Sequence, residues 1–167
     1  TFTDGSLSGT VTFTLPTQNA SMEDLTGNLT YTIKAGDEVI ASDTAAPGAQ
    51  VSASYTATAS GEVTFTCIAS QDTHVSKGAA KTIYIGIDTP AAPANVTLSP
   101  TTVTWDAVTT GIHDGYIDLS KVTYTVSINN QVVADGIKDT SCRTNLPVNA
   151  ELKNYVAKVT ATADGLT

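Results

Sequence analysis

The sequence predicts an all-β protein built from two tandem sandwich domains. Three observations lead there: apolar and polar residues alternate in short runs, blocks of the first half recur in the second, and a proline-containing connector lies between the halves. Alternation of this kind places every second side chain on one face of a strand. Threonine is abundant and favours strands because its branched Cβ suits a pleated surface. A helical period of useful length is missing.

The alternation defines strands around Thr10–Leu15, Leu29–Ile33, Glu62–Ser70 and Thr82–Ile87. In each run the apolar residues share one phase, as Val63, Phe65, Cys67 and Ala69 do in the third. Short strands separated by Gly, Asn and Asp are typical of a β-sandwich. We therefore expect these four runs to present one apolar face each to a common core.

The repeat consists of five matched blocks at a nearly constant offset of 92 to 94 residues. The blocks that begin at Val11, Asp24, Leu29, Val39 and Val63 recur at Val103, Asp118, Val122, Val132 and Tyr155. A constant offset indicates tandem duplication. The boundary is expected in the connector Asp88–Pro93, whose two prolines favour extended backbone. The predicted domains are residues 1–88 and 89–167.

The second half resembles the fibronectin type III family, an immunoglobulin-like sandwich. The resemblance rests on Pro93–Leu98, on Thr102–Ala107 with Trp105 at the core tryptophan position, on Val122–Ile128, and on Leu146-Pro147 followed by Tyr155. It implies a tyrosine corner, in which the Tyr155 hydroxyl bonds to upstream backbone. The first half diverges, since Phe13 replaces the tryptophan and Val63 replaces the tyrosine. There the family likeness follows from the repeat.

The resemblance also implies a seventh strand in the second domain, beside the strand that contains Val159. The sequence ends at Thr167, so we expect this domain to lack its last strand. Either that strand lies beyond the sequence in hand, or another chain supplies it by pairing with the open edge.

The loop Gly111–Asp118 is the candidate binding loop, through His113, Asp114, Tyr116 and Asp118. It resembles loops in fibronectin-like modules of secreted Bacteroidetes proteins, which accompany adhesin-type domains. A histidine with two carboxylates can ligate a divalent cation. The alternative is a solvated turn in which Asp and Gly adopt unusual backbone angles, and this interpretation is favoured. We therefore predict neither metal nor cofactor.

Thr44 is a candidate O-glycosylation site. Asp43-Thr44-Ala45 resembles the short acceptor pattern used by Bacteroidetes, and we expect it to lie in a loop.

Composition excludes several functions. The formal net charge of −8 and a pI of about 4.4 argue against nucleic acid and against docking on anionic membranes. A run of apolar residues long enough for a membrane span is absent from the sequence. Neither a nucleophile elbow nor a phosphate-binding loop is present, and the two histidines fall in different halves. The sequence therefore predicts a protein that is not an enzyme.

Three functions stay open. The favoured one is a non-catalytic spacer and interaction module of a larger extracellular or cell-surface protein, with an adhesin-related protein as one option and with further domains in the same parent chain. The second is a binding module for a surface protein or glycan that acts through the 111–118 loop. The third is an accessory segment of a secreted hydrolase. A sandwich fold does not choose among them.

Overall fold

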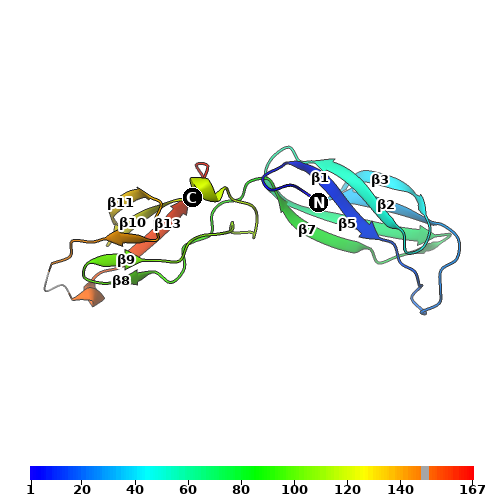
Figure 1. Cartoon of the computed structure of the whole chain (residues 1–167). Coiled ribbons are helices and arrows are strands. Elements are labelled where there is room, and N and C mark those ends of the chain that lie inside the picture. The colour runs from blue at the N-terminus through cyan, green and yellow to red at the C-terminus, as the bar shows by residue number, and fades with distance from the viewer. Residues whose placement is uncertain (148–150) are drawn as a thin grey trace. The chain divides into compact units, whose positions relative to one another are not determined.

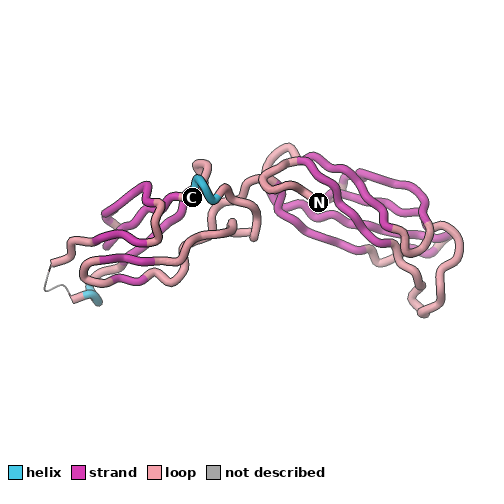
Figure 2. Tube along the Cα trace, viewed as in Figure 1, coloured by secondary structure: helices cyan, strands magenta, loops and turns pink. Residues whose placement is uncertain are grey.

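The computed structural model describes residues 1–147 and 151–167, and it confirms the all-β prediction (Figures 1 and 2). The chain divides into two compact units, Thr1–Gly86 and Ile87–Thr167, here called unit 1 and unit 2. The division lies two residues before the boundary expected from the prolines. Among the described residues, no helix is long and apolar enough to cross a membrane.

Unit 1 consists of two facing antiparallel sheets. Its strands are β1 (Ser8–Thr14), β2 (Leu29–Ala35), β3 (Glu38–Ala45), β4 (Gln50–Thr56), β5 (Gly61–Gln71), β6 (His74–Val75) and β7 (Ala79–Ile85). One sheet pairs β1 with β4, and the other has the order β3-β2-β5, with β6 and β7 both paired to β5. The strand β5 is therefore covered on both edges.

The core of unit 1 forms where the apolar phases of the two sheets meet. Val11 and Phe13 from β1 join Ile33 from β2 and Phe65 from β5, and Phe65 is fully buried. The Tyr55 ring meets the Phe65 ring edge-on, with centroids 5.3 Å apart. Aromatic packing of this geometry adds to simple area burial.

Unit 2 repeats this plan with shorter strands. They are β8 (Thr97–Leu98), β9 (Thr102–Thr104), β10 (Thr123–Ile128), β11 (Gln131–Ile137), β12 (Ser141–Arg143) and β13 (Ala157–Thr162). The sheet orders are β12-β9-β8 and β11-β10-β13. Two single 3₁₀ turns, η1 (Leu119–Lys121) and η2 (Leu152–Asn154), interrupt the loops (Figure 2).

The core of unit 2 centres on Trp105, which packs edge-on against Tyr124 at a centroid distance of 5.3 Å. The Tyr124 hydroxyl accepts a hydrogen bond of 2.9 Å from the buried Val108 N–H. This is a tyrosine whose hydroxyl bonds to backbone, but it lies on β10. The resemblance had assigned that role to Tyr155, and the described residues include no hydrogen-bond partner for the Tyr155 hydroxyl.

The repeat blocks occupy equivalent strands in the two units. The Val11 and Val103 blocks lie on β1 and β9, the Leu29 and Val122 blocks lead into β2 and β10, and those of Val63 and Tyr155 lead into β5 and β13. The strands therefore correspond, whereas the segments that close the ends of the two sandwiches differ.

Hydroxyl pairs cross between neighbouring strands on the solvent faces. Thr64 and Thr82 lie 2.7 Å apart between Oγ1 atoms, Thr97 and Thr104 lie 2.6 Å apart, and Ser8 Oγ lies 2.9 Å from Thr56 Oγ1. Such cross-strand pairs contribute roughly 0.2–1 kcal/mol each. Neutral hydroxyl pairs thus occupy positions where many sheets carry opposite charges.

Candidate functional site

A buried carboxylate, Asp88, organises the loops at the start of unit 2. Its side chain is charged and yet has no solvent exposure. A buried charge is costly unless its oxygens are hydrogen-bonded. The surroundings of Asp88 are built to meet that requirement.

Both carboxylate oxygens of Asp88 accept hydrogen bonds. Oδ1 accepts from the Thr89 N–H at 2.7 Å and lies 2.9 Å from His113 Nδ1. Oδ2 accepts from the His113 N–H at 2.8 Å and from the Gly115 N–H at 3.2 Å. An ionised carboxylate only accepts, so the His113 ring donates through Nδ1–H.

The pKa of Asp88 is lowered from its ordinary value. Desolvation is the largest influence and raises the pKa, but the His113 side chain and the N–H groups of His113, Thr89 and Gly115 lower it, and together they prevail. Asp88 is therefore held as the anion, which makes its hydrogen bonds charge-assisted and strong.

The connector from Ile87 to Ala91 is part of unit 2 and is hydrogen-bonded to it. The Asp88 N–H donates to Tyr116 O at 2.8 Å, Ile112 N–H to Thr89 O at 2.9 Å, and Ala91 N–H to Thr110 O at 3.0 Å. Gly111 is required at the crossing because a Cβ there would overlap the Asp88 carboxylate. Isolated bridges between Ile87 and Tyr116 and between Pro90 and Gly111 thus attach the connector to the 111–118 loop.

The four predicted loop residues have separate roles. His113 turns to Asp88, and its side chain keeps 39% exposure. Asp114 adopts a positive φ of 56° at a turn closed by its N–H to Gly111 O. Tyr116 is partly exposed and gives its carbonyl to Asp88 N–H. Asp118 caps η1 by accepting from the N–H and hydroxyl of Ser120.

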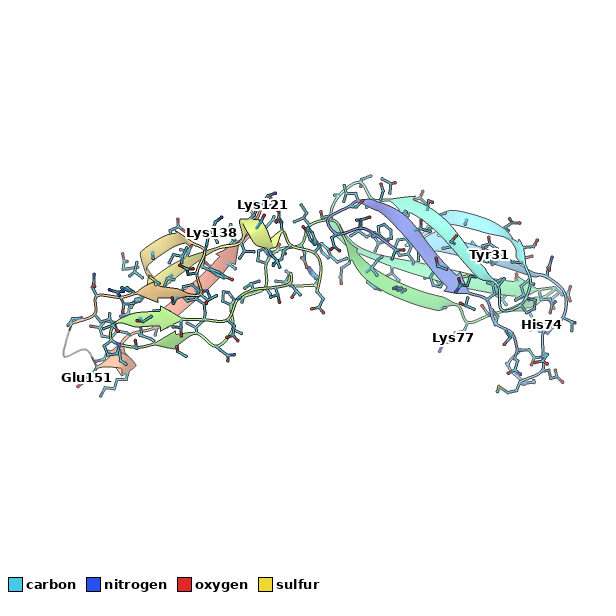
Figure 3. All side chains as sticks on the ribbon, viewed as in Figure 1. Tyr31, His74, Lys77, Lys121, Lys138 and Glu151 are labelled. Carbon is cyan, nitrogen blue, oxygen red and sulfur yellow. The ribbon has the colours of Figure 1, made fainter. Side chains whose placement is uncertain are left out.

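A second charged group, Lys121, connects η1 to the end of the chain. Its Nζ lies 2.5 Å from Asp164 Oδ1 and 3.5 Å from Asp118 Oδ2, and Figure 3 labels it on the short turn. Bonding to Ser120 and then to Lys121 lowers the pKa of Asp118, and the Asp164 carboxylate raises the pKa of Lys121. All three side chains are at least partly exposed, so this network contributes little to stability.

Two of the three residues of the cation-site alternative have other partners in the structure. His113 is engaged with Asp88, and Asp118 is engaged with Ser120 and Lys121. Within the described ranges, no group of three or more His, Cys, Asp or Glu side chains is placed to hold a metal. Asp114 has the positive φ of a turn residue, and the absence of a metal stays a prediction.

Thr44 does not lie in a loop as expected. It is in β3, paired with Thr30 of β2, and its own N–H donates to Asp43 Oδ1 at 2.8 Å. The side chain is exposed. Modification at Thr44 stays a prediction, now on an exposed edge strand.

Sequence reasoning missed the central residue of the cluster. Asp88 was read as part of a connector, because its partners lie 25 and 27 residues further along the chain. The sequence carries one weak signal, the glycine pair Gly111 and Gly115 around His113, which suggests a close backbone approach. Nothing local identifies what approaches.

The 111–118 loop and η1 also expose large apolar side chains. Ile112 and Leu119 are each 58% exposed and Tyr116 is 38% exposed. An aromatic side chain and two aliphatic side chains are thus exposed on this loop and on η1.

No family model matches this sequence, and no curated protein matches it. The solved structures to which this chain is similar include the following two. A biofilm-associated protein BSP domain is 18% identical over 93% of this chain and 25% of its own length, with a TM-score of 0.30. A central fibronectin-III array of RIM-binding protein is 15% identical over 96% of this chain and 60% of its own, with a TM-score of 0.28. The chain thus spans less than two thirds of the length of either.

Proposed function

We propose that this chain is a non-catalytic, fibronectin type III-like spacer and interaction segment of a larger extracellular or cell-surface protein. The observation that carries the proposal is the junction between the units. Ile85, the last residue of β7, is buried in unit 1, and Ile87 is already bridged to Tyr116 in unit 2. Gly86, the last residue of unit 1, lies between these two residues in the chain.

A spacer must hold the parts that it connects at a defined separation, and a long flexible linker cannot do this. Here the residues after Gly86 are fixed to unit 2 by the Asp88 hydrogen bonds and by the backbone bonds of Thr89 and Ala91. The prolines that follow, Pro90 and Pro93, remove further backbone freedom. These contacts support a short connection along the chain with little backbone freedom.

The test compares the chain with a variant carrying a Gly-Ser insertion of about eight residues between Gly86 and Ile87. Rotational correlation times from ¹⁵N relaxation are measured for each unit. The spacer function predicts that the units of the natural chain share one slow correlation time and that the insertion shortens it for both.

The control is an equally long insertion at the exposed Asn129-Asn130 turn, which leaves the junction unchanged and preserves the shared correlation time. If the natural chain already gives the short, separate correlation times of the junction variant, the chain is not a stiff spacer.

The second candidate function is ligand binding through the 111–118 loop, favoured by the exposed Tyr116, Ile112 and Leu119 on a fixed backbone. The ligand would be a surface protein or glycan. Glycan-array and cell-surface binding are measured for the natural chain and for Tyr116→Ala. Val132→Ala is the matched control, because Val132 is also exposed but lies on β11. Unaltered binding in Tyr116→Ala contradicts this function.

A further inference from the structure

A cavity opens in unit 2 near the turn that joins β10 to β11. Its volume is about 420 Å³, and pockets that hold small ligands in proteins measure roughly 300–1,000 Å³. Ile128, Asn129, Val133 and Tyr155 line it from the β11-β10-β13 sheet and its loops, and residues 143–146 line it from β12 and the loop that follows. The cavity therefore lies between segments that belong to the two sheets of the unit.

Hydrogen bonds within the chain fix both walls of this cavity. On one side, the two amide atoms of Asn129 bond to backbone groups on either side of Tyr155, at 2.8 and 3.2 Å. On the other side, Thr144 is buried, and its hydroxyl and N–H donate to the carbonyls of Pro100 and Thr101 at 3.3 and 2.8 Å. The walls are thus held before any ligand binds, as is usual for small-molecule sites.

Three polar side chains at this cavity are available to a ligand. Within the described residues, no hydrogen bond or ion pair reaches the Arg143 guanidinium, the Asn145 side-chain amide or the Tyr155 hydroxyl. The family resemblance predicted a backbone bond for that hydroxyl, whereas Tyr155 lines the cavity. A ligand can therefore bind these three groups without breaking a contact among the described residues.

Arg143 determines the charge of the cavity. It is the single arginine of the chain, and it carries the only charge among the described residues that line the cavity. A guanidinium is planar and always protonated, so it binds a carboxylate through two parallel hydrogen bonds. One cation matches the single charge of a carboxylate better than the nearly double charge of a phosphate monoester. Charges more than about 8 Å away are screened at physiological ionic strength, so the acidity of the whole chain does not cancel this attraction.

Unit 1 has neither of these two side chains at the equivalent positions. Ser54 pairs with β1 at the point of the repeat where Arg143 pairs with β9, and Val63 takes the place of Tyr155. The shared strand plan therefore does not require an arginine and a tyrosine here. Their presence together at one cavity of unit 2 is what indicates a ligand.

We propose that this cavity binds a carboxylate-bearing sugar, of the size of one uronic acid residue in a glycan. Arg143 binds the carboxylate, and Asn145 and the Tyr155 hydroxyl bind hydroxyls of the sugar ring. The apolar C–H face of the sugar packs on the Tyr155 ring and on Ile128. A neutral sugar leaves the guanidinium without its anion, and a carboxylate without hydroxyls leaves the amide and the phenol unpaired, so neither uses the whole site.

This site is distinct from the 111–118 loop and does not rest on the spacer function. The loop precedes β10, whereas Ile128 and Asn129 lie where β10 ends. The two candidate binding surfaces of unit 2 are therefore at opposite ends of one strand, and each can be tested without the other.

The first experiment titrates the natural chain, labelled with ¹⁵N, with small probes. Methyl glucuronide and methyl galacturonide carry the carboxylate, methyl glucoside and methyl galactoside are their neutral counterparts, and cyclohexanecarboxylate has the carboxylate without hydroxyls. We expect at least one of the two uronides to shift the amide signals of residues 128–133 and 143–146 in a saturable manner. The neutral sugars and cyclohexanecarboxylate should bind at least about tenfold more weakly, because each loses part of the hydrogen bonding.

The second experiment repeats the uronide titration with variants. We expect about tenfold weaker binding in Arg143→Gln, which removes the charge, and about threefold weaker binding in Tyr155→Phe, which removes the hydroxyl. Lys138→Gln is the matched control, because Lys138 is exposed and loses the same charge but lies outside the residues that line the cavity. Tyr116→Ala, the variant of the 111–118 loop, should leave uronide binding unchanged.

A titration in which neither uronide gives a saturable shift overturns the proposal without any variant. Equal binding of the neutral sugars or of cyclohexanecarboxylate also overturns it, since the cavity then recognises only a ring or only an anion. Uronide binding that is unaltered in Arg143→Gln, or that falls equally in Lys138→Gln, contradicts the role of Arg143 and overturns the site as assigned.

Discussion

Units 1 and 2 have corresponding core strands and an aromatic pair in each core, but they differ in the polar side chains that they bury. Unit 1 packs aromatic rings around the fully buried Phe65, and unit 2 packs Trp105 against Tyr124. Unit 2 contains both of the buried polar residues identified in the described chain, Asp88 and Thr144. Thr144 bonds to the Pro100 carbonyl at 3.3 Å. The comparison teaches that two units with corresponding strands can keep their apolar phases while one of them also buries polar side chains in its loops.

The largest expected effect is that of Asp88→Ala. The substitution leaves the N–H groups of Thr89, His113 and Gly115 without their acceptor, and removal of one partner from a buried charged cluster typically costs about 3–5 kcal/mol. We expect unit 2, followed by Trp105 fluorescence in urea, to lose about 3 kcal/mol while the unit 1 transition in circular dichroism stays in place.

Asp139→Ala is the control, because Asp139 is exposed and its removal should change stability by less than about 0.5 kcal/mol. A loss shared equally by both units after Asp88→Ala would contradict the assignment of Asp88 to unit 2.

The second largest effect is expected from acid, which should destabilise unit 2 more than unit 1. The pKa of Asp88 is lower in the folded chain than in the unfolded chain, where it is about 3.9. Its contribution is therefore fully present above the unfolded pKa and is lost as pH falls through the folded pKa. Asp118 and Asp135, also with lowered pKa, add to this direction. We expect the unfolding midpoint of unit 2, followed by Trp105 fluorescence, to fall with acid below about pH 4. In Asp88→Asn this midpoint should fall less steeply with pH. Equal pH dependence in the two proteins would contradict the role of Asp88.

A smaller effect is expected from Tyr124→Phe, which removes the acceptor of the buried Val108 N–H. An unsatisfied buried donor costs about 1–3 kcal/mol. The matched control is Tyr31→Phe at the equivalent position of unit 1, where the described residues give the hydroxyl no hydrogen bond. Thermal or urea unfolding should show a loss of about 1–2 kcal/mol for unit 2 and almost none for unit 1. A similar loss in both variants would remove this difference between the units.

The smallest effect is expected from Trp105→Phe, which gives unit 2 the residue that unit 1 has at Phe13. Trp105 Nε1 is buried and has no hydrogen-bond partner among the described residues. Removal of this donor offsets part of the cost of lost packing. Followed by circular dichroism, the net loss should stay near 1 kcal/mol; a loss above about 3 kcal/mol would show that packing alone decides at this position.

The sequence predicted those parts of the fold that depend on neighbouring residues. Alternation placed Phe65, Cys67 and Ala69 on the buried side of β5, because a strand alternates faces whatever its partner. Prediction from the sequence failed where a residue distant in the chain determines the local structure or the burial. Thr44 lies in a strand because β2 pairs with it, and Asp88 is buried because the loop around His113 folds over it.

The candidate site was predicted as a loop but not as a cluster. His113, Asp114, Tyr116 and Asp118 do lie on one loop, yet their polar atoms turn to Asp88, Gly111 and Ser120 instead of to one another. Four residues within six positions cannot reveal such partners, since backbone turns and contacts with Asp88 fix the direction of each side chain. The tyrosine with a backbone-bonded hydroxyl was likewise assigned to Tyr155 and found at Tyr124.

The cross-strand hydroxyl pairs have a consequence for the medium in which the chain works. Dissolved salt weakens an exposed ion pair, because counterions screen its charges within about 10 Å at 0.1 M. The pairs Thr64–Thr82, Thr97–Thr104 and Ser8–Thr56 carry no net charge, so ions have little to screen. The sheet surfaces therefore keep these contacts from fresh water to brine.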